Sequence, residues 1–427
     1  MIIGIDASRA NRDRKSGTEY YSYYLIKNLA KIDSKNQYIL YTDKPLKGGL
    51  LDLSHSDSDF FSGKQKPTYD KDGYQIIKSP YNNFKAKVLH WPFGFFWTLG
   101  RLSLEMLFKK PDVLFVPAHA LPLIFPRRTI NTIHDIAFER DKKVYRSENI
   151  LFYGRILKRI VNFFAKLFTF GKYGSTHADY LSWSTRFALK KASLIITISN
   201  FSKKEIVEVY KTDPKKIKVI YNGFNNSAYK KIHNKEKIKK ILRDHGIDFP
   251  YILFVGRLEK KKNTPALVEA FAIAKEKNPN LKEKLVLLGY GSYGYDEVKY
   301  LIEEYNLSNE VVMPGWVEEK DMAFLYNGAS AFIFPSKHEG FGIPLIEAMA
   351  CGLPVACSDI PVLREVAGDS ALFFDPEDVC AIATAIEEIL KNNDLRSALI
   401  EKSLKKSENF SWERCAEETS RAINELK

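Results

Sequence analysis

The sequence predicts an α/β protein made of two doubly wound, Rossmann-like domains that face each other across a cleft. The chain has 427 residues, which is too long for one ordinary hydrophobic core. Short apolar runs of strand type alternate with helical patterns along the chain, as in parallel sheets covered by helices. This alternation fills both halves of the chain, over about 200 residues each, so each half can form one such domain.

The first predicted domain covers residues 1–230. Its first strand is Ile2–Asp6, and residues 18–31 form a helix rich in tyrosine. Residues 44–73 are polar, and we expect a surface loop or a poorly ordered insertion there. The other strands are expected at Tyr38–Tyr41, Gln75–Lys78, Val113–Val116, Arg128–Ile133, Leu194–Ile198 and Lys218–Tyr221.

The second predicted domain covers residues 231–405 and begins with a lysine-rich helix over residues 233–245. Residues 406–427, which include Trp412, are expected to form a terminal helix. The other helices are expected at Thr264–Lys277 and Asp296–Tyr305, and the strands at Tyr251–Gly256, Leu285–Leu288, Val311–Met313, Ala331–Phe334, Val355–Cys357 and Ala371–Phe374.

Composition and charge limit the classes of function. Hydrophobic residues make up 45% of the chain and aromatic residues 13%, which excludes a disordered chain. The net charge of +13 fits an anionic partner: a nucleotide diphosphate, an acidic lipid surface or nucleic acid. No module that reads RNA or DNA is recognisable, so we expect no nucleic-acid partner. The four cysteines form no C-x-x-C pair, which is typical of small core residues in a reducing cytosol.

A glycine-rich turn and a short helix lie within residues 337–354, KHEGFGIPLIEAMACGLP. Pro344 takes a favoured first-turn position, and Gly352 is a plausible C-cap. The first amides of such a helix have no partner within the helix and attract phosphate. The residues expected to meet the phosphate here are Gly340, Phe341, Gly342 and Ile343.

Two carboxylates flank the start of this helix. Glu339 lies in the turn before it, and Glu347 lies about one turn inside it. One carboxylate can therefore face each end of a bound diphosphate ester.

A basic loop connects the first expected strand of the second domain to the helix that follows it. Its sequence, at residues 256–263, is GRLEKKKN. Arg257 can bind phosphate oxygens with its forked guanidinium, and Lys262 can add a point charge. Loops at the carboxyl ends of parallel strands are where open α/β sheets bind ligands. Without the glutamate motif, a solvated basic loop would be the better interpretation.

Two further candidates lie in the first domain. His134 follows the strand Arg128–Ile133, on the carboxyl edge of the sheet, and a histidine there can donate or accept a hydrogen bond at neutral pH. A single histidine is more often structural. Gly17 precedes the tyrosine-rich helix, where a glycine loop can closely approach the phosphates of a bound ligand.

These motifs together resemble those of retaining glycosyltransferases with the GT-B fold, glycosyltransferase family 4. The glutamate run is similar to the E-x7-E signature, residues 256–263 to the G-R-L-x-x-x-K-N donor loop, and Thr-Ile-His-Asp to the active-site histidine segment. The resemblance implies that Arg257 and Lys262 bind the leaving diphosphate and that His134 contacts the transferred sugar. It also implies that the terminal helix packs back onto the first domain. Glu347 is expected to hold the donor ribose hydroxyls and Glu339 to contact the sugar ring.

The resemblance implies an enzyme, a hexosyltransferase that keeps the anomeric configuration of a nucleotide-diphosphate sugar. The acceptor would be a hydroxyl of a saccharide or lipid-linked glycan in surface polysaccharide or glycolipid assembly. The opening Gly-Ile-Asp-Ala-Ser-Arg and Thr-Ile-His-Asp-Ile-Ala-Phe look closest to bacterial mannosyltransferases, which favours GDP-mannose. The alternatives are a transferase that uses a UDP-sugar (glucosyl, galactosyl or N-acetylglucosaminyl) and a catalytically silent protein that binds a sugar nucleotide.

Neither a cofactor nor a metal ion is expected. Gly289-Tyr-Gly-Ser-Tyr-Gly294 matches the nicotinamide fingerprint G-x-G-x-x-G, but the next expected strand ends in Pro-Gly-Trp instead of an acidic residue. Asp57-Ser-Asp59 imitates a metal-binding D-x-D, but no strand flanks it. Cationic side chains and helix amides would neutralise the diphosphate instead.

The localisation expected from the sequence is cytoplasmic, with peripheral association on the inner face of an anionic membrane. Residues 150–170 combine many aromatic residues with Arg155, Lys158, Arg159 and Lys166. Both an interfacial amphipathic helix and a core helix with a solvated basic face have this composition. No uncharged apolar stretch reaches the roughly 18 residues that a membrane span needs.

Overall fold

The computed structural model describes residues 1–54, 66–92, 97–140 and 176–426. It divides into two compact units, Met1–Gly223 with Trp412–Lys427, and Phe224–Ser411. The chain passes between the units a few residues from the positions 230 and 405 that the sequence suggested. The segment 150–170 and the pair Asp57 and Asp59 lie outside the described residues.

The first unit contains an eight-stranded sheet in the order β3-β4-β2-β1-β5-β6-β7-β8. Its pairs are parallel except β3 with β4. The strands are β1 Ile2–Asp6, β2 Gln37–Thr42, β3 Gln75–Ile76, β4 Phe84–Val88, β5 Val113–Val116, β6 Thr129–Ile133, β7 Leu194–Thr197 and β8 Ile217–Val219. β5, for example, is an apolar run that is buried on both faces of the sheet.

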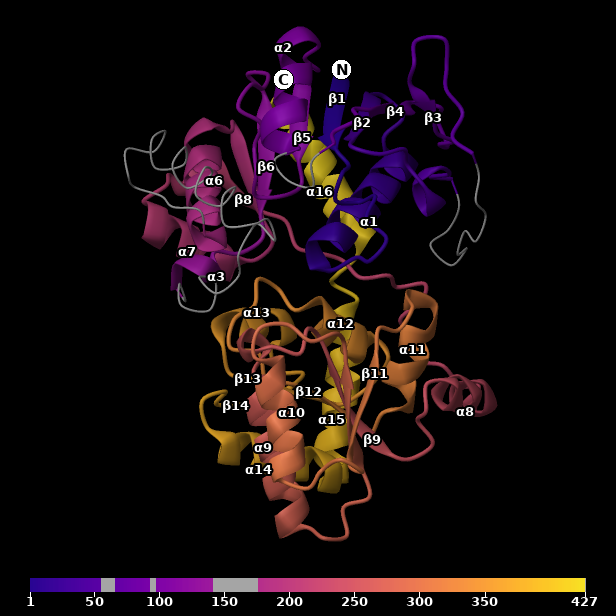
Figure 1. The fold of residues 1–427 in the computed structure, drawn as a ribbon, viewed down its shortest axis with the longest axis vertical. Coiled ribbons are helices and arrows are strands. Elements are labelled where there is room, and N and C mark those ends of the chain that lie inside the picture. The colour runs from indigo at the N-terminus through magenta and orange to yellow at the C-terminus, as the bar shows by residue number, and fades with distance from the viewer. Residues whose placement is uncertain (55–65, 93–96, 141–175, 427) are drawn as a thin grey trace. The chain divides into compact units, whose positions relative to one another are not determined.

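The helices of this unit cover the sheet, as Figure 1 shows. They are α1 Gly17–Ile32, α2 Ser103–Phe108 with the π-helical turn Thr98–Leu102 before it, α3 Ala137–Arg140, α6 His177–Lys191, α7 Asn200–Tyr210 and α16 Trp412–Glu425. α16 lies along α1, where Trp412 stacks on Tyr24 with ring centroids 5.6 Å apart. The C-terminal segment thus belongs to the first unit although it follows the second in sequence.

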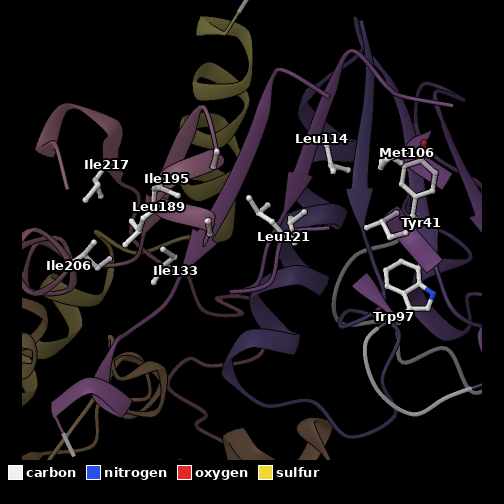
Figure 2. Packing of buried hydrophobic residues seen from close by; sticks show 14 of the residues in the cluster. Tyr41, Trp97, Met106, Leu114, Leu121, Ile133, Leu189, Ile195, Ile206 and Ile217 are labelled. Atoms are coloured by element: carbon white, nitrogen blue, oxygen red, sulfur yellow. The ribbon is translucent and has the colours of Figure 1, made fainter. Parts of the chain in front are cut away.

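A hydrophobic core fills one side of this sheet. Tyr41 from β2, Leu114 from β5 and Ile133 from β6 contribute to it, together with Met106 from α2 (Figure 2). The part of 44–73 that the structure describes is more packed than the sequence suggested, because Leu46, Leu50 and Leu53 are buried. The polar composition of this segment does not reveal that these three leucines are buried.

The second unit contains a six-stranded parallel sheet in the order β11-β10-β9-β12-β13-β14. Its strands are β9 Tyr251–Val255, β10 Lys284–Leu288, β11 Val311–Gly315, β12 Ala331–Phe334, β13 Val355–Ser358 and β14 Leu372–Phe374. Its helices are α8 Lys235–Asp244, α9 Thr264–Lys277, α10 Tyr295–Glu304, α11 Glu319–Gly328, α12 Ile343–Ala350, α13 Pro361–Ala367, α14 Val379–Lys391 and α15 Asn393–Ser407.

The order of the strands in this sheet reverses between β9 and β12, which lie side by side. At such a switch point, the connections after the two central strands lead to helices on opposite faces of the sheet, and open α/β sheets commonly bind ligands there. One loop is 256–263 and the other is 335–342, so the two predicted phosphate-binding segments meet at this switch point.

The predicted α/β class with two doubly wound sheets is confirmed. The predicted terminal helix 406–427 was too long, because α15 runs to Ser407 and a turn separates it from α16. Across the described parts of the chain, no helix has the length and apolar character needed to cross a membrane. Three of the cysteines are buried, as expected of core residues, and Cys380 is exposed.

Candidate functional site

An ion pair joins the two loops at the switch point of the second unit. Lys262 Nζ lies 2.5 Å from Glu339 Oε1, and both side chains are largely buried. A backbone hydrogen bond from Lys337 N to the carbonyl of Lys261, at 3.1 Å, holds the same loops together. The structure thus brings together two residues that are 77 positions apart.

Arg257 extends from the same loop toward solvent. Its side chain is 45% exposed, and its guanidinium lies 3.4 Å from Oε1 of the buried Glu259. This contact is long for a hydrogen bond, so Glu259 orients the guanidinium without using most of its N–H groups. A phosphate can therefore bind Arg257 without displacing a strong partner.

The helix α12 begins beside this pair. Gly342 is its N-cap with φ +98°, a conformation that side-chain residues rarely adopt, and Pro344 follows in the first turn. The first backbone amides of such a helix are the groups that can bind an anion. Among the residues expected here, Phe341 contributes only backbone, because its buried ring packs edge to face on Phe410 at 5.6 Å.

Glu347, one turn into α12, is held by two tyrosines. Its Oε2 accepts a hydrogen bond of 2.9 Å from the Tyr326 hydroxyl, and Tyr229 donates another. The two phenol rings pack edge to face at 5.8 Å. Burial raises the pKa of Glu347 to about 8, and the Tyr326 hydroxyl partly offsets this rise.

The loop of residues 289–294 packs against the loop 256–263. The amide of Leu258 donates to the carbonyl of Tyr290 at 3.1 Å, and the amide of Ser292 donates to the carbonyl of Leu258 at 3.1 Å. A Cβ on Gly289, where φ is +140°, would overlap the carbonyl oxygen of Gly256. The glycines of this false nicotinamide motif therefore permit close packing between two loops.

His134 lies in the first unit, at the carboxyl end of β6. Its Nε2 donates to the carbonyl of Pro117 at 3.2 Å, and its ring packs edge to face on Tyr21 at 4.8 Å. Burial, with a smaller contribution from His119, lowers the pKa of His134 to about 4. The imidazole is therefore neutral at pH 7 and contributes no positive charge.

Gly17 is the first residue of α1, behind the N-cap Ser16. Glu19 accepts a hydrogen bond from the Ser16 amide at 3.2 Å and forms an ion pair with Arg9 at 3.2 Å. A Cβ on Gly17 would meet open space, so a ligand can approach this helix start. The sequence Ser-Gly-Thr-Glu at residues 16–19 forms a capping box at this helix start.

Sequence reasoning missed both tyrosines around Glu347. Tyr326 lies on the buried face of α11, and Tyr229 lies before α8. Nothing in the local pattern ties either tyrosine to a carboxylate elsewhere in the chain. Among the described residues, no group of three His, Cys, Asp or Glu side chains is placed to hold a metal ion.

Comparisons with known families match both parts of the chain. The family model described as Glycosyltransferase Family 4 matches residues 16–228, and the model described as Glycosyl transferases group 1 matches residues 235–406. Together they cover the phosphate-binding loops, the glutamate motif and His134.

Two curated relatives align with most of the chain. The O-antigen chain mannosyltransferase B of Escherichia coli is 29% identical over 331 residues, which are 77% of this chain and 83% of that protein. The O-antigen chain mannosyltransferase RfbU of Salmonella typhimurium is 25% identical over 346 residues, 80% of this chain and 83% of that protein.

Solved structures resemble the whole chain in fold. The sucrose-phosphate synthase of Thermosynechococcus elongatus has a TM-score of 0.68 at 17% identity and covers 100% of this chain and 99% of its own. WaaG, a glycosyltransferase involved in lipopolysaccharide biosynthesis, has a TM-score of 0.65 at 14% identity and covers 99% of both chains. At these identities the likeness concerns the fold alone.

Proposed function

Because this chain belongs to glycosyltransferase family 4 and is a hexosyltransferase with the GT-B fold, we propose that it transfers mannose from GDP-mannose with retention of configuration. The acceptor in this proposal is a hydroxyl of a saccharide or lipid-linked glycan in surface polysaccharide assembly. Mannose is favoured because two relatives that align with more than three quarters of the chain are O-antigen chain mannosyltransferases.

The observation that carries this proposal is the cationic site at the switch point of the second unit. Arg257 and Lys262 lie in the loop after β9, and α12 follows the neighbouring strand β12, so in this proposal the two cations and the first amides of α12 bind one diphosphate. As the bond between the sugar C1 and the phosphate oxygen breaks, negative charge grows on the leaving diphosphate. Donors that are already oriented toward this charge lower the barrier without reorganising.

Glu339 has two tasks in this proposal. In the ligand-free protein it pairs with Lys262, which keeps the lysine in place. Lys262 has three N–H donors, so it can bind a phosphate oxygen and still hold Glu339. A carboxylate that is paired in this way is a poor nucleophile, and its free oxygen is better suited to a hydrogen bond with the sugar ring.

Retention then follows from attack on the face that the diphosphate leaves. The acceptor oxygen forms its bond to C1 while the bond from C1 to the phosphate oxygen breaks, and the acceptor proton passes to the departing phosphate. The protein contributes positioning and charge stabilisation in this step.

His134 is proposed to contact the transferred sugar as a neutral group. Its Nε2 is used by the carbonyl of Pro117, so a sugar hydroxyl must approach Nδ1 or the ring edge. Its low pKa keeps Nδ1 a hydrogen-bond acceptor throughout the physiological pH range.

Thermal stabilisation by a panel of nucleotide sugars tests the donor. A ligand that binds only the folded protein raises the free energy of unfolding by RT ln(1 + [L]/Kd). We expect GDP-mannose and GDP to raise the melting temperature more than UDP-sugars do. Selective stabilisation by UDP-glucose, UDP-galactose or UDP-N-acetylglucosamine would instead identify a UDP-sugar as the donor. Binding without any donor hydrolysis or transfer would favour a silent sugar-nucleotide-binding protein.

A further inference from the structure

The short helix α2 of the first unit is apolar on two opposite faces. Leu102 and Met106 are fully buried, and Met106 points into the core beside Tyr41 (Figure 2). Leu104, Leu107 and Phe108, at spacings of three and four residues, share the other face, and they are 50%, 53% and 80% exposed. A surface helix normally presents polar residues on its solvent face.

A fourth exposed apolar residue adjoins this face. Leu123 is 53% exposed, and its backbone amide donates to Ser103 Oγ at 2.7 Å, so it lies beside the first turn of α2. We call Leu104, Leu107, Phe108 and Leu123 the apolar patch. Contiguous exposed apolar side chains of this kind mark an interaction surface.

Basic residues extend from the patch along one edge of the sheet because of the sheet topology. β5, β6, β7 and β8 are adjacent and parallel, so the residues before each of them lie along one edge of the sheet, the amino edge. Each of the four strands is preceded by a pair of basic residues, and six of these eight side chains are exposed. The pairs are Lys109 and Lys110, Arg127 and Arg128, Lys190 and Lys191, and Lys215 and Lys216.

Acidic residues along the same stretches do little to cancel this charge. Asp112 accepts a hydrogen bond from the Ile2 amide at 2.7 Å, and Asp213 accepts one from the Lys215 amide at 2.9 Å. These two carboxylates face eight cations in the segments 109–112, 127–128, 190–191 and 213–216. The edge is therefore strongly positive and carries an apolar patch at one end.

We propose that the amino edge of the first unit docks on an anionic lipid surface, with the apolar patch inserted among the lipids. Cations beside exposed Leu and Phe match the two layers of such a surface, anionic headgroups above acyl chains. A soluble polyanion would use the cations but would leave Phe108 in water. A protein partner fits less well, because lysine is depleted from the buried centres of protein interfaces.

This docking mode leaves the carboxyl edge of the same sheet accessible. His134 and the start of α1 follow the carboxyl ends of β6 and β1, whereas the apolar patch lies at the amino edge. Figure 1 shows α2 at the same end of the unit as the N-terminus, where β1 begins. Lipid binding at this edge is therefore independent of the donor and of the proposed reaction.

Co-sedimentation of the full chain with vesicles tests the proposal. Wild-type protein is expected to bind phosphatidylglycerol–phosphatidylcholine vesicles at low salt and to ignore vesicles of phosphatidylcholine alone. The combined variant Leu104→Ser, Leu107→Ser, Phe108→Ser is expected to lose more than tenfold in affinity, because insertion of these side chains is lost. The combined variant Lys109→Gln, Lys110→Gln, Arg127→Gln should lose roughly a hundredfold, about fivefold for each cation near the surface.

Matched controls keep these outcomes specific. Ile76→Ser with Tyr300→Ser removes exposed apolar side chains elsewhere, and Lys235→Gln, Lys239→Gln, Lys240→Gln removes exposed lysines from α8. Both controls should bind like the wild type, and all variants should keep the wild-type melting temperature and donor hydrolysis.

Three results would overturn the proposal. The first is wild-type protein that does not bind anionic vesicles. The second is an apolar-patch variant that binds as well as the wild type while soluble heparin displaces the protein, which would identify a polyanion site. The third is binding that survives both patch variants and is lost in Arg155→Gln, Lys158→Gln, Arg159→Gln, Lys166→Gln, which would place the contact in residues 150–170.

Discussion

The pair of Lys262 and Glu339 illustrates how one contact serves both structure and the proposed chemistry. The two side chains neutralise each other in a largely buried place, so neither is left as an unpaired charge. Arg257 differs from Lys262, because it is half exposed and has only a long contact to Glu259. Replacement of each side chain by alanine should therefore affect the stability of the protein differently.

Arg257→Ala is expected to lower kcat without lowering the melting temperature. Loss of one oriented donor to growing negative charge typically costs about 2.7–4 kcal/mol of barrier, or a factor of about 10² to 10³. Lys262→Ala should lower kcat as strongly and also reduce the free energy of unfolding by up to about 3 kcal/mol, because Glu339 loses its partner. Steady-state kinetics and thermal melts measure both effects.

Lys260→Ala is the matched control for these variants, since Lys260 pairs with Glu297 at 2.5 Å instead of with Glu339. It should retain wild-type kcat. Near wild-type kcat in Arg257→Ala would show that the assigned phosphate site is wrong.

Glu347 is expected to make nucleotide affinity depend on pH. The pKa of its carboxyl is about 8 in the free protein, and ribose hydroxyls donate best to the ionised form. Nucleotide binding should therefore lower this pKa, and by linkage the affinity for GDP should rise as pH increases toward 8 and level off above it. Calorimetric titration with GDP between pH 6 and about 9 measures this dependence.

Three variants separate the contributions to this pH dependence. Glu347→Gln should bind GDP more weakly at pH 8 and show no rise, whereas Glu339→Gln should spare GDP binding and impair transfer. Tyr326→Phe removes a hydrogen bond that lowers the Glu347 pKa, so the rise should move to higher pH. Equal losses of GDP affinity in Glu347→Gln and Glu339→Gln would contradict this division of roles.

At the scale of elements, the central strands were predictable from sequence and the exceptions have physical reasons. β1, β5 and β12 have the predicted bounds, because short apolar runs buried on both faces leave little choice of register. β4 was missed, because Phe-Lys-Ala-Lys-Val alternates with lysine and its strand character depends on pairing with β2. The exposed apolar face of α2 could not be predicted, because leucine and phenylalanine in a helix are normally buried.

The packing of the loop 289–294 against the phosphate-binding loop gives a prediction at this scale. Gly289→Ala should displace the backbone at Gly256 and lower donor turnover at least about tenfold, together with the melting temperature. Gly315→Ala is the matched control: its φ of +80° is also unfavourable for alanine, but nothing lies within 4 Å of the new Cβ. It should lose about 1 kcal/mol of stability and keep its turnover. Equal effects of both substitutions on turnover would argue against a role for the loop 289–294 in positioning the loop 256–263.

At the scale of the whole molecule, the second-unit site was predictable to the extent that it follows from topology. Arg257 and Glu339 follow two strands that become neighbours at the switch point, so strand order alone brings their loops together. The two tyrosines on Glu347 depend on how α11 and the segment before α8 pack, which no local pattern encodes. The neutral state of His134 likewise depends on burial.

Independence from divalent cations is a further prediction for the whole enzyme. Arg257, Lys262 and the α12 amides are proposed to offset the charge of the diphosphate, so excess EDTA should leave donor turnover unchanged. Complete inhibition that magnesium restores would instead direct attention to Asp57 and Asp59. A coupled assay for released GDP, with and without EDTA, distinguishes the two outcomes.

The anomeric configuration of the first product tests the central claim most directly. Purified protein is incubated with GDP-mannose, whose sugar is α-linked, and proton NMR follows the mannose released to water or transferred to an added saccharide before mutarotation. The account predicts consumption of GDP-mannose with the α anomer formed first, and a loss of this signal in Arg257→Ala. The β anomer formed first, or consumption of a UDP-sugar while GDP-mannose stays intact, would contradict it.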